Sequence, residues 1–121
     1  MRVIAGEFRR RILKSIPGLD TRPTPDRLRE ALFNVLQDRL EGVPFVDAYA
    51  GTGAVGIEAM SRGATPVIFI ERSKAGVQAI KENLASLKAL DRARVAAIVE
   101  TDIALRRAQS FAACLDADTS A

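Results

Sequence analysis

An apolar run that leads straight into closely spaced glycines lies near the middle of the sequence: Phe45-Val46-Asp47-Ala48-Tyr49-Ala50-Gly51-Thr52-Gly53-Ala54-Val55-Gly56. The run is typical of a buried strand, and residues 54–62 have the pattern of a helix that Gly63 ends. Between them, the glycines form G-x-G-x-x-G, where missing Cβ atoms let the backbone turn sharply and let a cofactor approach the helix N-terminus. This context predicts the cofactor-binding turn of an α/β protein.

The alternation of strand and helix continues toward the C-terminus. Residues 67–70 predict a second apolar strand, Ser73 can cap a helix that runs to about Leu90, and residues 95–99 predict a third strand. Strands that alternate with helices of this length indicate a parallel sheet with right-handed crossovers. Beyond the third strand we expect one more helix over residues 103–115 and a frayed tail.

Toward the N-terminus, the apolar pairs Val3-Ile4 and Ile12-Leu13 predict a β-hairpin. A hydroxyl N-cap and a proline at the first helical position, Thr24-Pro25, then begin an amphipathic helix over residues 25–41. Its apolar stripe, expected to face the core, consists of Leu28, Leu32, Val35, Leu36 and Leu40. We therefore expect three parts: a basic hairpin at 1–18, a linker and helix at 19–42, and a partial Rossmann-like domain at 43–121.

The composition fits one soluble globular domain, because 48% of the 121 residues are hydrophobic and 27% are charged. No apolar run is long enough to span a membrane, and the charged start differs from a signal peptide, so we expect a cytoplasmic protein. A lone cysteine, Cys114, and the lack of histidine exclude an internal disulfide, a thiolate zinc site and histidine triads. We expect no metal site, and chemistry that depends on carboxylates, hydroxyls, backbone amides or a bound cofactor.

Positive charge is concentrated at the N-terminus. Residues 1–14 carry five cationic side chains against one acid, Glu7, whereas the rest of the chain is close to neutral. The five are Arg2, Arg9, Arg10, Arg11 and Lys14. A basic segment on a near-neutral body is expected of a nucleic-acid-binding protein, although a solvated pair of charged strands has the same composition.

Acidic residues around the glycine turn bear on the choice of cofactor. Glu71, at the end of the second strand, can accept hydrogen bonds from both hydroxyls of an adenosine ribose. Asp47, with Glu58 in the following helix, would repel the diphosphate of a dinucleotide and attract the ammonium and sulfonium of S-adenosylmethionine. Asp102 can accept from an adenine amino group or cap a helix. A nicotinamide cofactor and S-adenosylmethionine both stay open, but the missing GK[ST] ending excludes a nucleoside triphosphatase.

Three ordered segments resemble one known family. They are residues 1–9 (MRVIAGEFR), residues 21–34 (TRPTPDRLREALFN) and residues 47–59 (DAYAGTGAVGIEA). Together they are similar to the bacterial small-subunit ribosomal RNA (guanine-N2)-methyltransferases, and the similarity covers roughly residues 1–102. The resemblance implies an N-terminal basic β-hairpin and helix followed by the parallel sheet of a class I methyltransferase. It also implies methyl transfer from S-adenosylmethionine to a guanine amine during assembly of the 30S subunit.

The resemblance also implies roles for individual residues. Asp47, Ala50 and the turn Gly51-Thr52-Gly53 would hold the methionine part of the cofactor, Glu71 its ribose and Asp102 its adenine. The residues implied to face RNA are Arg9, Arg10, Arg11, Arg22 and Arg27.

The sequence departs from this family in one respect. Family members carry an Asp/Asn-Pro-Pro-Tyr/Phe motif after a fourth strand, and this sequence has no Pro-Pro pair. We therefore expect a shortened member with an incomplete sheet, no assigned catalytic residue, weak cofactor binding and little methyl transfer by this chain alone. Without a fourth strand, residues 45–50 would form an open apolar edge that aggregates or recruits another chain. Two alternatives stay open: a non-catalytic RNA-binding remnant and a fragment of an NAD-dependent oxidoreductase.

Overall fold

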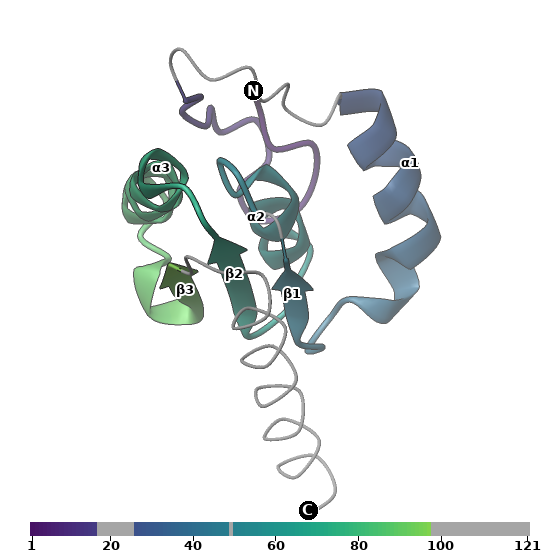
Figure 1. Cartoon of the computed structure of the whole chain (residues 1–121). Coiled ribbons are helices and arrows are strands. Elements are labelled where there is room, and N and C mark those ends of the chain that lie inside the picture. The colour runs from purple at the N-terminus through teal and green to yellow at the C-terminus, as the bar shows by residue number, and fades with distance from the viewer. Residues whose placement is uncertain (17–25, 49, 98–121) are drawn as a thin grey trace, which may run out of the picture.

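Three parallel strands form the centre of the computed structural model, which describes residues 1–16, 26–48 and 50–97. They are β1 (Phe45–Asp47), β2 (Val67–Glu71) and β3 (Ala93–Ala97), in the order β1-β2-β3 (Figure 1). Val67 of β2 is in register with Phe45 on one side and with Ala93 on the other. The predicted parallel sheet is confirmed, and β1 is its edge strand within the described residues.

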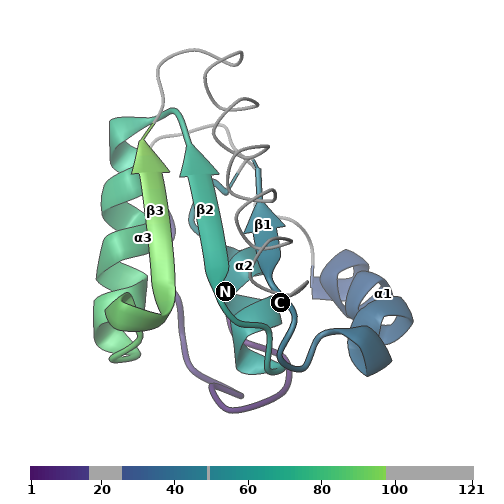
Figure 2. The ribbon, with the colours of Figure 1, turned by 90° about the horizontal axis from the view of Figure 1, so that it is seen from below.

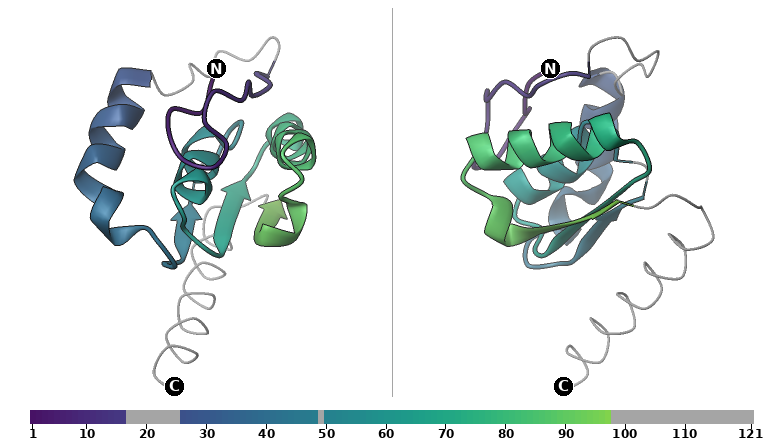
Figure 3. Two further views of the ribbon diagram at one scale, coloured as in Figure 1. Left: turned by 180° about the vertical axis from the view of Figure 1, so that it is seen from behind. Right: turned by 60° about the vertical axis from the view of Figure 1, so that its left-hand side comes forward.

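Helices α2 (Ala54–Ser61) and α3 (Lys74–Ser86) lie on one face of this sheet, as Figures 2 and 3 show. The predicted cap of α3 is present, since the Ser73 hydroxyl accepts a hydrogen bond from the Gly76 amide at 2.9 Å. Helix α1 (Asp26–Leu36) lies on the β1 side of the sheet and leads into the 3-10 helix η1 (Gln37–Arg39) (Figure 2). A second 3-10 helix, η2 (Leu90–Arg92), precedes β3.

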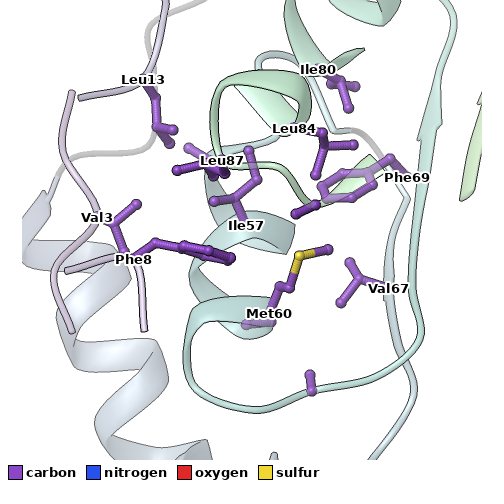
Figure 4. Close-up of a cluster of buried hydrophobic side chains, with 14 of the residues drawn as sticks. Val3, Phe8, Leu13, Ile57, Met60, Val67, Phe69, Ile80, Leu84 and Leu87 are labelled. Carbon is purple, nitrogen blue, oxygen red and sulfur yellow. The ribbon is translucent and has the colours of Figure 1, made fainter. Parts of the chain in front are cut away.

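Alternation along β2 places Val67 and Phe69 on the face that α2 and α3 cover (Figure 4). Both side chains are completely buried, together with Ile57 of α2 and Ile80 of α3. The packing is close at Gly56, where an added Cβ would lie 2.3 Å from Cε1 of the Phe69 ring. The third glycine of the motif is therefore needed so that α2 can lie against β2.

The N-terminal segment packs on α2 and α3 as a closed loop. Its one bridge pairs Arg2 with Ile12 in antiparallel fashion, so the predicted hairpin forms with minimal strand structure. Val3, Phe8 and Leu13 are buried in the same core cluster as the sheet and helices (Figure 4). The basic segment is thus attached to the body through its apolar residues.

Helix α1 buries a different face from the one its sequence predicts. Its two buried side chains are Arg29 and Phe33, whereas Leu28, Leu32 and Val35 are exposed. Phe33 is buried in place of these three residues because its ring has two partners. The ring centroid lies 6.2 Å from that of Phe45 in β1 and 5.0 Å from Cζ of the Arg62 guanidinium. The prediction that all five aliphatic residues of this stripe face the core was wrong for three of them.

No helix in the described ranges is long and apolar enough to cross a membrane, and these ranges hold no cluster of three residues suited to bind a metal. Asp102, Arg22 and the expected helix at 103–115 lie outside the described residues.

We predict that Gly56→Ala destabilises the chain by about 2–4 kcal/mol, because the new methyl group would overlap a ring that has no free space. Urea unfolding would measure the change. Phe69→Leu in the same chain should relieve part of the cost, so that the double variant is more stable than the sum of the single changes predicts. Gly42→Ala is the control, because its Cβ would meet no atom of the described residues within 4 Å. Only the positive φ of 72° at this position should then destabilise the chain, by about 1 kcal/mol. Equal losses at the two glycines would contradict this account of the packing.

Candidate functional site

The candidate site lies where β1 and β2 end and α2 begins. Residues 50–53 form a tight turn, in which Gly53 donates a hydrogen bond to the Ala50 carbonyl at 2.7 Å. Gly51 and Gly53 have φ values of +56° and +85°, a region that glycine enters without strain. Among the described residues, a Cβ on Gly51 would meet no atom within 4 Å, so this part of the structure leaves the outer side of the turn open to a ligand.

Asp47, at the end of β1, accepts a hydrogen bond from the start of α2, just after this turn. Its Oδ2 accepts a hydrogen bond of 3.0 Å from the amide of Gly56, in the first turn of α2. The pKa of Asp47 is raised from 3.8 to about 6. Burial is the largest cause and raises this pKa, the hydrogen bond from the Gly56 amide lowers it, and the charge on Glu71 raises it. The carboxylate therefore anchors the helix N-terminus, and at neutral pH its charge costs stability.

Glu71 lies at the end of β2 and connects the turn with the start of α3. Its Oε1 accepts from the Gly51 amide at 3.2 Å, and its Oε2 accepts from the Ser73 amide at 3.0 Å. Gly76 gives it room, because a Cβ there would lie 2.7 Å from both Cγ and Oε2 of Glu71. Each oxygen retains a lone pair that can accept from a ligand hydroxyl.

Asn83 is a further residue of this region, and no sequence motif predicts it. The side chain is buried in α3, donates to the Thr52 carbonyl at 3.1 Å and accepts from the Lys14 amide at 2.7 Å. It also donates to the Lys14 carbonyl at 3.3 Å. One amide group thus links the glycine turn to the N-terminal segment.

The prediction that Glu58 acts beside Asp47 on a cofactor was wrong, because Glu58 is completely buried and faces the N-terminal segment. It accepts from the amides of Ile4 at 2.8 Å and Ala5 at 3.1 Å, and from Nε of Arg62 at 2.9 Å. Nη1 of Arg29 lies 3.8 Å from Oε1 of Glu58. These contacts neutralise Glu58 within the protein.

The residues predicted to face RNA are exposed where the structure describes them. Arg9, Arg10 and Arg11 are exposed on the N-terminal loop, and Arg27 is exposed on α1. Nη2 of Arg11 donates to the Ser86 carbonyl at 2.8 Å, at the C-terminal end of α3 where a cation is favoured. The other guanidinium groups can therefore meet a polyanion without breaking a described hydrogen bond.

The site combines an open glycine turn with two carboxylates close enough to raise the pKa of one of them. Such a pair favours a ligand that brings positive charge and hydroxyl groups, and disfavours a ligand that brings a diphosphate. The residues present therefore fit S-adenosylmethionine.

We predict that Asp47→Asn stabilises the chain at pH 8 by about 1–3 kcal/mol. The folded pKa of Asp47 exceeds its unfolded value, so ionisation disfavours the folded state above pH 6, whereas asparagine keeps an oxygen that accepts from Gly56. The advantage should shrink as the pH falls from about 6 to 4 and should be absent below 4. Urea unfolding of both proteins at several pH values would test this, and an advantage that is constant with pH would contradict it.

Comparison with known proteins places the chain in a family. Residues 1–116 match the family model described as "Conserved hypothetical protein 95". The chain is 45% identical to Escherichia coli "Ribosomal RNA small subunit methyltransferase D" over 91 residues, which are 74% of this chain and 45% of that protein.

Solved structures show the same fold. A protein of Thermus thermophilus superposes with a TM-score of 0.77 and 34% identity, over 93% of this chain and 63% of that one. The Escherichia coli structure named "Putative methyltransferase yhhF" gives a TM-score of 0.72 and 40% identity, over 82% of this chain and 53% of that one. The chain therefore has a class I methyltransferase-like α/β fold, and it spans about half the length of the curated relatives it matches. The chain is thus similar to a protein named as a ribosomal RNA small subunit methyltransferase, and, with a family model that matches residues 1–116, it belongs to the Conserved hypothetical protein 95 family.

Proposed function

We propose that this chain forms the cofactor-binding part of an S-adenosylmethionine-dependent methyltransferase that modifies a guanine N2 of small-subunit ribosomal RNA in the cytoplasm. The observation that carries the proposal is the pair of carboxylates, Asp47 and Glu71, that flank an open glycine turn. The names of the similar proteins support the reaction class and the RNA. The RNA partner is free ribosomal RNA or an assembling 30S particle.

Each residue has a defined part in this proposal. Ala50 and the turn Gly51-Thr52-Gly53, held by Asp47, bind the methionine part of the cofactor. Glu71 accepts from the ribose hydroxyls, and Asp102, outside the described residues, binds the adenine. When bound, S-adenosylmethionine supplies an electrophilic methyl group on a sulfonium.

The contribution of these residues is orientation and electrostatics. The negative potential of Asp47 and Glu71 favours the cationic cofactor over its neutral product, in which the sulfonium has become a thioether. The sequence contains no Pro-Pro pair, so the residues that would position the guanine are not assigned, and we expect little methyl transfer by the 121-residue chain alone.

We predict that the chain binds S-adenosylhomocysteine in titration calorimetry and that NAD binds at least tenfold more weakly. Glu71→Ala should reduce the affinity for S-adenosylhomocysteine at least tenfold, because both ribose contacts are lost. Glu30→Ala is the matched control, since Glu30 is an exposed acid on α1. Asp47→Asn should weaken S-adenosylmethionine more than S-adenosylhomocysteine, because only the former carries a sulfonium charge. Preference for NAD would support the oxidoreductase alternative and overturn the proposal.

The N-terminal loop is the proposed RNA contact. Arg9, Arg10, Arg11 and Arg27 are exposed, and Arg22 lies outside the described residues. The loop is held on the body by buried Val3, Phe8 and Leu13, so its arginines are presented on a fixed support. A fixed cationic surface binds phosphates at a lower entropic cost than a free tail does.

We predict that replacing Arg9 and Arg10 by Ala weakens the binding of small-subunit ribosomal RNA and lowers the slope of log K against log salt by roughly 1–2. Arg11 is left in place because it also contacts Ser86. Arg39→Ala is the control, as an exposed cation on η1. RNA binding that survives Gly53→Val while cofactor binding is lost would show that the two sites are separable. RNA binding that ignores the Arg9 and Arg10 changes would contradict the proposed contact.

A further inference from the structure

The outer side of α3 carries a row of exposed lysines. Lys74 is the first residue of the helix, Lys81 follows seven residues later, and Lys88 lies two residues beyond its end. All three are exposed, and none forms an ion pair or a side-chain hydrogen bond with another described residue. We call these three residues the lysine row. Seven residues are close to two turns of a helix, so Lys74 and Lys81 lie on the same side of α3, about 10 Å apart along its axis.

Acids of the same segment do not neutralise the lysine row. Residues 74–88 contain one acid, Glu82, against the three lysines. Glu82 instead pairs with Lys14 of the N-terminal segment, at 3.2 Å between Nζ and Oε2. Exposed cations without partners create a positive potential, and this potential attracts a polyanion.

The two end positions of the lysine row are not the positions that favour a lysine for folding. Lys74 lies at the N-terminus of α3, where the helix dipole disfavours a cation and the first turn holds no acid. Lys88 has a φ of +55°, which glycine adopts with less strain. Another residue type would be more stable at either position, and exceptions of this kind are characteristic of functional surfaces.

The lysine row adjoins the basic N-terminal loop. Nη2 of Arg11 donates to the carbonyl of Ser86, the last residue of α3, at 2.8 Å. Figures 1 and 3 show the N-terminal segment beside α3. The row therefore extends the cationic surface that begins at Arg9 and Arg10 along the length of α3, over about 20 Å.

The composition of this surface fits double-stranded RNA better than single-stranded RNA. Proteins that select single strands stack the bases on exposed aromatic side chains. Within the described residues Phe8, Phe33 and Phe69 are buried and Phe45 is half-buried, so no exposed ring is available for stacking. Double-stranded RNA is instead recognised by its shape and by contacts to its phosphates. Lysines on a straight helix can make such contacts, because each is a flexible point charge that needs no bidentate geometry.

We propose that the lysine row, continuous with Arg9 and Arg10, binds the phosphates of a double-stranded segment of small-subunit ribosomal RNA. Contacts of this kind position the RNA without reading its sequence. The inference rests on the RNA substrate of the proposed function, and it adds a second surface, on α3, to the contact proposed for the N-terminal loop.

The test compares the binding of the full 121-residue chain to a hairpin of small-subunit ribosomal RNA and to an unpaired RNA of the same length and base composition. The hairpin should bind more tightly. Replacing all three lysines of the row by Gln should weaken hairpin binding about tenfold or more and lower the slope of log K against log salt by roughly 2–3. Glutamine has nearly the helix propensity of lysine, so the thermal unfolding midpoint of the triple variant should not fall.

A gain of charge provides a matched pair of variants. Ala85 is exposed on α3, four residues after Lys81, so Ala85→Lys adds a cation beside the row. This variant should tighten hairpin binding by about two- to fivefold. Asn34→Lys adds the same charge at an exposed position of α1 and should change the affinity by less than about twofold.

Equal affinity for the hairpin and the unpaired RNA would overturn the proposal. Hairpin binding that is lost when Arg9 and Arg10 become Ala, but is unchanged in the triple lysine variant, would overturn it and leave the proposed loop contact intact. Absence of RNA binding by the unaltered chain would contradict both contacts. Titration with S-adenosylhomocysteine is carried out separately: RNA binding through the lysine row without cofactor binding would support this inference and contradict the proposed function.

Discussion

The carboxylate of Glu58 joins three separate parts of this small protein. It lies completely buried in α2, accepts from two amides of the N-terminal segment and pairs with Arg62 and Arg29. Arg29 is itself completely buried and comes from α1, where it also contacts Asp26 and the Arg2 carbonyl. Its Nε and Nη1 have no hydrogen-bond partner within the described residues, and the negative charges of Glu58 and Asp26 both compensate for its burial. Glu58 thus contributes to the positions of both the basic loop and α1.

The acids of the candidate site are used differently from Glu58. Asp47 and Glu71 accept hydrogen bonds from backbone amides of the turn, of α2 and of the residue that precedes α3. None of these donors, all within the described residues, carries a positive charge. The raised pKa of Asp47 is the energetic result of this arrangement. A site that would be more stable without one of its charges is characteristic of function rather than of packing. The stability lost in the free protein can be recovered when a cationic ligand binds.

The sequence predicts those features that depend on local chemistry. The glycine turn, the Ser73 cap, and the position of Glu71 at the end of β2 follow from motifs only a few residues long, and the structure agrees with each. The buried face of α1 could not be predicted in the same way. The apolar residues of α1 cover more of its circumference than the body of the protein buries. Contacts with Phe45 and Arg62, which are distant in sequence, decide that Phe33 is buried and Leu32 is exposed. Asn83 and Glu58 were missed as structural links because their partners lie 31 to 69 and 53 to 54 residues away along the chain.

The amide of Asn83 has a consequence for how the two ends of the molecule communicate. Its nitrogen is shared between the carbonyls of Thr52 and Lys14, so a shift of either carbonyl changes the geometry available to the other. If a ligand at the turn changes the binding free energy of a polyanion at the basic loop, the polyanion must change the binding free energy of that ligand by the same amount. Any coupling that passes through Asn83 would be carried by a single planar amide group.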